Sequence, residues 1–186
     1  MDRRRAQLAR VEAELDEARR RAHAIADPLD SERWTARPAP KRWSVAECLV
    51  HLNLTSQAFL PLIDDAIVRG RDGNLLSDAP LRMDVVGRLL WWASTFSLPI
   101  KTKDPFVPAR VAARDTVLAE YDRLQRELIR GLRNADGLDL GRLRIVSPFD
   151  PRIKYHLYSC FRVIPAHQRQ HLKQAEGVVR SLRARR

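Results

Sequence analysis

Apolar residues recur every three or four positions along most of this chain, a spacing that places them on one face of an α-helix. The first such segment predicts an amphipathic helix over residues 3–26, which ends at the sequence "ADP" because proline does not continue a helix. Its apolar stripe consists of Leu8, Val11, Leu15, Ala18, Ala22 and Ile25. The chain is therefore expected to begin with a long helix packed against a core.

A second helix is predicted from Ser44 to about Gly70, with a kink at Pro61. The sequence "SVAE" forms a capping box, in which Ser44 caps the first turn and Glu47 reaches back to the cap. Further helices are predicted over residues 82–97, 110–134 and 152–183. The connectors are residues 27–43, "GRDGNLLSDAP", "LPIKTKDPFVP" and the long loop "NADGLDLGRLRIVSPFDP".

These segments predict an all-α fold. No alternating run is long enough to require a sheet, and no internal repeat is visible. Four long helices joined by lengthy connectors predict an antiparallel four-helix bundle that carries one extra short helix. The length of 186 residues suits one domain with a sizeable core, so residues 1–186 are expected to form a single domain.

The formal net charge of +11 raises the question of nucleic acid. The basic residues are dispersed and alternate with acids, as in "RVEAELDEARRR", which indicates solvated helix faces rather than a binding arm. We therefore expect no nucleic-acid partner. A bundle that binds nucleic acid through this charge is the alternative, and a steep fall of affinity with salt would distinguish it.

We expect a cytoplasmic protein that does not cross a membrane. The charged N-terminus has no apolar run behind it. The most apolar stretch, "VVGRLLWWASTFSLPI", is interrupted by Arg88 and is shorter than the ~20 apolar residues that span a bilayer. The two cysteines, Cys48 and Cys160, cannot form a disulfide framework and fit a reducing compartment.

Two of the five histidines, His167 and His171, lie four residues apart in the last predicted helix. Side chains at this spacing point the same way and can share a metal ion, but the spacing also arises often by chance. His51 is a candidate third ligand, since it lies among leucines and valine within the second predicted helix. It is either a core histidine bonded to a backbone carbonyl or hydroxyl, or a ligand that faces the pair across the bundle.

Two motifs resemble the signatures of the DinB/YfiT-like superfamily. The stretch "KRWSVAECLVHL" is similar to its Trp-Ser-x-x-Glu-x-x-x-His-Leu motif, and "IPAHQRQHLKQAE" is similar to its closing His-x-x-x-His motif. They occur in the family's order, in its second and last long helices. The resemblance implies a four-helix bundle with one divalent metal ion held by His51, His167 and His171.

Three histidines leave a position open for water or substrate, whereas structural zinc sites usually have four protein ligands. Neutral imidazoles suit several ions, so we expect zinc or nickel, with iron and manganese as alternatives. The resemblance implies a metal-dependent enzyme for a small molecule, either a thiol-dependent S-transferase, as in bacillithiol and mycothiol relatives, or a hydrolase. The alternative is a metal-binding module without catalysis, acting in binding or the stress response. We also expect a homodimer.

Three further residues are candidates for smaller roles. Glu47 is expected mainly to cap its helix, with support of a ligand or general-base catalysis as the alternative. Gln174 shares the face of His171 and is expected either to assist at the metal or to form an ordinary interhelical amide contact. Trp43 is expected to pack against the start of the second helix.

Overall fold

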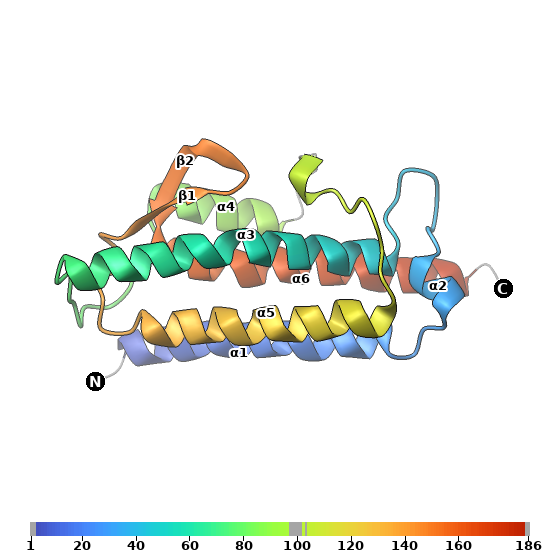
Figure 1. Cartoon of the computed structure of the whole chain (residues 1–186), viewed down its shortest axis with the longest axis horizontal. Helices are drawn as coiled ribbons and strands as arrows, with labels where there is room; N and C mark the ends of the chain where they lie inside the picture. The colour runs from blue at the N-terminus through green and yellow to red at the C-terminus, as the bar shows by residue number, and fades with distance from the viewer. Residues whose placement is uncertain (1–2, 97–101, 103, 185–186) are drawn as a thin grey trace.

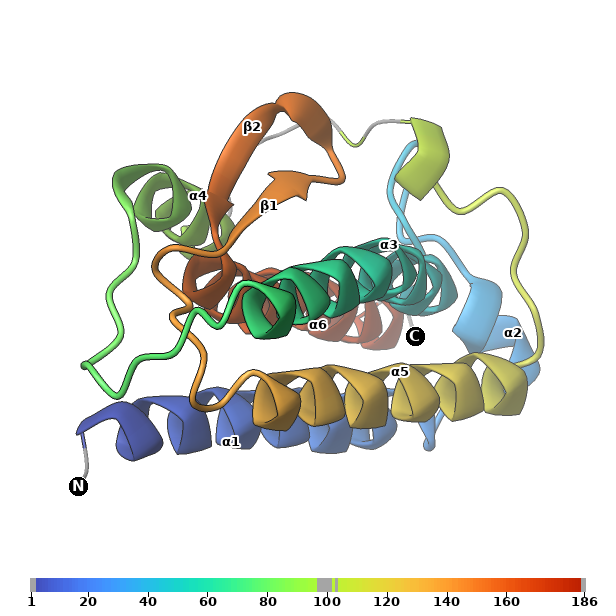
Figure 2. The same cartoon turned by 60° about the vertical axis from the view of Figure 1, so that its left-hand side comes forward.

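The computed structural model describes residues 3–96, 102 and 104–184, and within them four long helices lie side by side (Figures 1 and 2). These helices are α1 (Arg3–Ala26), α3 (Val45–Asp72), α5 (Arg114–Asn134) and α6 (Leu157–Arg183). Helices α1 and α3 each pack against both α5 and α6. The four predicted long helices are therefore confirmed, and the fold is mostly helical.

Some neighbouring long helices run antiparallel and others run in the same direction (Figure 1). Helix α1 runs antiparallel to α5 and α3 runs antiparallel to α6, whereas α3 and α5 run in the same direction, as do α1 and α6. The sequence predicted antiparallel neighbours throughout. The long connection between α3 and α5 returns the chain to the end of the molecule where α3 begins (Figure 1). Because α5 starts at that end, it runs in the same direction as α3.

A second layer of short elements covers one side of the long helices (Figure 2). It contains α4 (Val85–Thr95), the 3₁₀ turn η1 (Asp104–Phe106) and a hairpin of strands β1 (Arg144–Ser147) and β2 (Asp150–His156). Helix α4 packs against α6 and β2. The short helix α2 (Ser31–Thr35) lies separately, at the end of the molecule where α3 begins. This layer shapes the surroundings of the site described below.

The hairpin contradicts the prediction of a fold without a sheet. Residues 144–147 were expected to be part of a loop and residues 152–156 part of the last helix, but α6 begins only at Leu157. Strand β1 has four residues in an exposed–buried alternation, too short for a period of two to stand out. Pro148 lies in the turn and Pro151 near the start of β2. Because proline is disfavoured within sheets, the sequence of this segment indicated a connector.

Other boundaries differ by a few residues. The connector over residues 27–43 contains α2, which is capped by Asp30. The helix expected over 82–97 is α4, capped by Asp84, and its predicted last residue lies outside the described residues, as does part of the connector "LPIKTKDPFVP". The capping box of Ser44 and Glu47 is present, and α3 continues through Pro61 without a break.

A glycine sets the close approach of α4 to α6. A Cβ atom at Gly87 would lie 2.2 Å from the Cβ of Ser159, so only glycine fits there. The Ser159 hydroxyl donates to the Asp84 carboxylate at 2.7 Å and accepts from the Asp84 backbone N–H at 3.2 Å. The first turn of α4 is thereby fixed on α6.

Two hydrophobic clusters fill the interior between the long helices. One includes Phe59, Leu132 and Phe161 and extends to the hairpin, and the other surrounds the first turns of α3. Among the described residues, no helix combines the length and the apolar composition that are needed to cross a membrane. The apolar stripes that the sequence predicted supply much of this core, and Leu138, Leu140 and Leu143, from a segment predicted to be a loop, also belong to it.

Candidate metal centre

His51 lies in the second turn of α3 and is 2% exposed. Its Nδ1–H donates to the carbonyl oxygen of Phe106 in η1 at 2.8 Å. Since a neutral imidazole carries one proton, this bond leaves the Nε2 atom with a free lone pair. The bond of His51 to a backbone carbonyl is therefore confirmed, and its Nε2 atom remains free to bind a metal ion.

His167 and His171 come from the middle of α6, with their ring centroids 4.6 Å apart. The Nδ1–H of His171 donates to the side-chain oxygen of Gln174 at 3.0 Å, which again leaves Nε2 as the free nitrogen. A histidine that binds metal commonly donates its other N–H to such an acceptor. Gln174 is thus positioned to orient the ring of His171 through this hydrogen bond.

The three histidines meet although α3 and α6 are far apart in the chain. One nitrogen from each lies within 4.8 Å of the other two. The Nε2 atoms of His51 and His167 are 3.3 Å apart. Two ligands at 2.0–2.1 Å from a tetrahedral zinc ion are about 3.3–3.4 Å apart, so this spacing fits a shared ion. The same distance also allows a hydrogen bond between the two rings, with donor and acceptor set by the tautomers.

The pKa values of all three histidines are lowered. Burial lowers the pKa of His51, against a raising effect of its bond to the Phe106 carbonyl. Burial, followed by repulsion from His171 and His51, holds the pKa of His167 well below the ordinary value. Burial and His51 lower the pKa of His171 to about 3. The cluster is therefore neutral at pH 7, which is the ligand form of imidazole.

Aromatic side chains surround the cluster. The Trp43 ring stacks near His171, with centroids 5.8 Å apart and planes at 30°, and lies 5.0 Å from the ring of His51. Phe149, in the hairpin turn, lies 6.0 Å from His167. The sequence placed Trp43 at the start of α3 but did not show that it covers two histidines, and it gave no sign of Phe106 or Phe149. The tryptophan of the Trp-Ser motif was the available signal.

Glu47 has other partners. Its carboxylate accepts hydrogen bonds from the Arg37 guanidinium and from the Ser44 backbone N–H. Burial raises the pKa of Glu47, but the hydrogen bonds from Arg37 and Ser44 outweigh it, so that the pKa is lowered overall. The capping role is confirmed. A lowered pKa makes this carboxylate a weak proton acceptor at pH 7, and its role as a general base stays a prediction.

A cavity of about 330 Å³ opens onto the three histidines. Its walls come from α3, α4, the hairpin and α6. They include Phe59, Leu90, Ala93, Phe149, Ile153 and Val163. Trp91 and Trp92 of α4 do not line it, and Trp92 is exposed on the outer side. The cluster is thus reachable by a small molecule.

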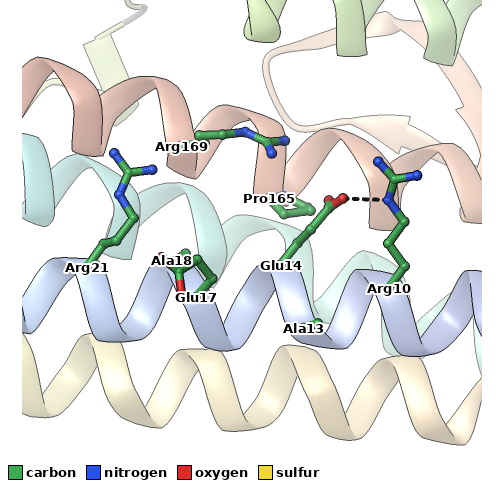
Figure 3. Close-up of a pocket in the computed structure, with 8 residues that line it drawn as sticks. All are labelled: Arg10, Ala13, Glu14, Glu17, Ala18, Arg21, Pro165 and Arg169. Carbon is green, nitrogen blue, oxygen red and sulfur yellow. Dashed lines mark hydrogen bonds and ion pairs between the residues drawn. The ribbon is translucent and has the colours of Figure 1, made fainter.

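A second hollow, of about 240 Å³, lies between α1 and α6 above Pro165 (Figure 3). Arg10, Arg21 and Arg169 project around it, and Glu14 accepts from Arg10 at 3.1 Å. None of the three clustered histidines lines this hollow. The three histidines therefore lie at the first cavity and not at this hollow.

Long packed helices with a three-histidine cluster between two of them define a class of helical proteins equipped to hold a metal ion. The family model of the DinB superfamily matches residues 14–175, and the chain belongs to this superfamily. The resemblance seen in the two motifs is confirmed. Comparisons with curated proteins and with solved structures found no match.

Proposed function

We propose that this protein is a divalent-metal-dependent enzyme that acts on a small molecule, with His51, His167 and His171 as ligands of one ion. The observation that carries the proposal is the convergence of three neutral imidazoles, two of them 3.3 Å apart, at the floor of a cavity. The scaffold we propose is a single domain over residues 1–186, built as a four-helix bundle. Zinc or nickel is the expected ion, with iron and manganese as alternatives.

The chain's own residues hold this site in one arrangement. Phe106 and Gln174 accept the Nδ1 protons of His51 and His171 and so keep their Nε2 atoms available. Trp43 covers the rings of these two histidines and keeps water from them on that side. A divalent ion with three imidazole ligands keeps an open position and lowers the pKa of a water or thiol bound to it.

Among the possible reactions, we propose thiol-dependent transfer ahead of hydrolysis. In such a transfer the thiol loses its proton to solvent and its sulfur bonds to an electrophilic carbon. The bond from that carbon to its leaving group breaks, and the leaving group departs with the electron pair. Zinc hydrolases commonly add a carboxylate as a general base. Here Glu47 is occupied by Arg37, and Asp150, the carboxylate in the cavity lining, is bonded to Arg152.

The test is a coupling assay. The metal-loaded protein is incubated with monochlorobimane and with bacillithiol, mycothiol or glutathione. We expect one thiol to react faster in the presence of the protein and the enhancement to vanish in the His51→Ala variant. Metal-dependent ester or amide cleavage without thiol transfer would assign a hydrolase. Inactivity in both assays would favour a metal-binding module without catalysis.

The remaining expectations on partners and location also stand as proposals. The protein acts in the cytoplasm, without nucleic acid. A homodimer is supported by the outer face of α4, where four apolar side chains at helical spacing are 48–64% exposed: Val85, Leu89, Trp92 and Phe96. Sedimentation equilibrium should show a dimer that the Leu89→Glu substitution dissociates. A monomeric wild-type protein would contradict this part.

A further inference from the structure

The cavity beside the histidines has an unusual charge balance for so basic a chain. Although the net charge is +11, none of the described residues that line the cavity is lysine or arginine. Its polar lining consists of hydroxyl groups, an amide and one carboxylate, contributed by Ser94, Thr102, Ser147, Tyr155, Gln170 and Asp150. The arginine and lysine side chains of the described residues thus lie outside this lining.

Among the described residues of the lining, the few ionisable side chains do not supply a binding partner for an anion. Asp150 accepts two hydrogen bonds from the Arg152 guanidinium, at 3.0 and 2.8 Å, and this arginine extends outward with its side chain 87% exposed. Burial raises the pKa of the Tyr155 phenol, which is therefore neutral. Apart from the proposed metal ion, the described residues of the lining offer no cation to replace the hydration that a carboxylate would lose in this space.

The walls favour an apolar guest instead. The rings of Phe59 and Phe149 meet edge to face, with centroids 5.7 Å apart. The ring of Phe149 also lies 6.0 Å from the ring of His167. Leu90 and Ala93 of α4 and Val163 of α6 add aliphatic surface. Aromatic walls of this kind recognise rings through stacked or edge-to-face contact.

The size of the cavity sets a limit on the guest. A dry cavity of about 150 Å³ holds one benzene molecule. The space of about 330 Å³ beside the histidines therefore corresponds to about two rings. It extends from the nitrogen atoms of the cluster, so a guest that fills it has one end at the ligands.

We infer that this cavity binds an uncharged aromatic or branched aliphatic group of about one to two rings, attached to the atom that meets the metal. The inference rests on the proposed function and narrows its substrate class. A thiol transfer has two reactants, the thiol and the electrophile, and the cavity suits whichever of them carries the apolar group.

Binding of thiol probes to the cobalt(II)-substituted protein tests this inference without relying on turnover. The probes are 2-naphthylmethanethiol, benzyl mercaptan and cyclohexylmethanethiol, compared with 3-mercaptopropionate and cysteamine. Each is titrated by the charge-transfer absorbance of sulfur bound to cobalt, with correction for the pKa of the thiol. The arylmethyl thiols should bind with a Kd at least about tenfold lower than that of 3-mercaptopropionate.

Two variants locate the effect in the cavity. Ala93→Trp fills the space and should remove the preference while the ligand-field spectrum of cobalt stays unchanged. The matched control is Ala119→Trp, which places the same side chain on the exposed face of α5. Ile153→Arg introduces a cation into the lining and should shift the preference toward 3-mercaptopropionate, with far-UV circular dichroism as a check on folding.

The outcomes separate the two proposals. Failure of the wild-type protein to bind cobalt would overturn the metal site and, with it, the proposed function. Cobalt binding with equal affinity for all probes, or tighter binding of 3-mercaptopropionate, would overturn the apolar cavity alone. Retention of the preference in a folded Ala93→Trp protein would do the same, because the preference would then arise elsewhere.

Discussion

The Nε2 atoms of His51 and His167 lie 3.3 Å apart although 116 positions separate these residues in the chain. A contact this short needs either a proton on one nitrogen or an ion that both nitrogens bind. The first case leaves a single hydrogen bond in a neutral pair. In the second case the lone pair of each Nε2 atom binds the ion. The hydrogen bonds from His51 to the Phe106 carbonyl and from His171 to Gln174 already favour the tautomers that leave Nε2 free.

Replacing both His167 and His171 by alanine should remove the metal from the protein. Wild-type protein purified without an affinity tag is expected to hold about one divalent ion per chain, and one imidazole alone is a poor chelate. Mass spectrometry of the digested protein measures the metal content. The control is His23→Ala, because His23 interacts with Asp122 and lies outside the cluster. Full occupancy in the double variant would refute the ligand assignment.

Removing the metal should leave the protein folded. The core consists of apolar stripes from the four long helices, and the ion adds only its binding free energy to the folded state. Chelator should therefore lower the free energy of unfolding by the linkage amount, about 2.7 kcal/mol when free metal had been at one hundred times its Kd. Urea unfolding with and without chelator measures the difference. Complete unfolding by chelator would mark the ion as structural.

The Gln174→Leu substitution should weaken metal binding about 10–100-fold, because the acceptor that fixes the tautomer of His171 is lost. Competition with a chromophoric chelator gives the Kd. Gln57→Leu is the matched control, since Gln57 donates to Glu120 on an exposed surface. If both variants bind metal like the wild type, Gln174 has no part in orienting the ligand.

The metal-free protein should lose stability as the pH falls below about 6.5. The three folded-state pKa values are lowered, so the unfolded chain takes up protons that the folded cluster refuses. This stability is fully present above pH 6.5 and declines toward the folded pKa, about 3 for His171. The slope is about 1.4 kcal/mol per pH unit for each proton.

Urea titrations of the metal-free protein from pH 7.5 to pH 5 check this dependence. The comparison is the variant in which all three histidines are replaced by alanine, which should show a shallower slope over the same range. Other groups that titrate in this range remain in both proteins. Equal slopes would mean that the histidines titrate alike in the folded and unfolded chains, contrary to their burial.

Gly87→Ala should destabilise the protein by about 1–3 kcal/mol, because the added Cβ would overlap Ser159 and force α4 away from α6. Metal content should not change, since α4 contributes no ligand. Thermal unfolding measures the first effect. The control is Gly177→Ala in α6, where the nearest atom is 3.7 Å away and the substitution should stabilise by about 0.5–1 kcal/mol. A Gly87→Ala protein as stable as the wild type would show that the two helices adjust freely.

The helices were predictable because their signals are local. The apolar stripe of α1 and the capping box of Ser44 and Glu47 are readable within a few residues. The four-residue strand β1 has too few positions for its period to be distinct, and its pairing with β2 depends on a turn with Pro148. The path of the chain between α3 and α5 depends on the whole connection, so no short stretch of sequence predicts it.

The site was predictable in part for the same reason. The spacing of His167 and His171 indicates a pair on one face, whereas the third ligand followed from a resemblance and not from spacing. The acceptor for His51 is a backbone carbonyl 55 positions away, and a carbonyl has no side-chain identity to read. Trp43 was visible as a motif residue, but its stacking on His171 depends on how α3 and α6 meet.

The three histidines and part of the cavity wall belong to different layers of the molecule. The histidines lie on α3 and α6, which share the core, whereas the wall residues Leu90 and Ile153 belong to α4 and the hairpin in the outer layer. A mutation in that layer can change the shape offered to a substrate without moving a ligand. Proteins that descend from such a gene can therefore differ in the small molecules that they bind while they retain the same three histidines. Exchange of the outer segments alone is a route to a new substrate selectivity.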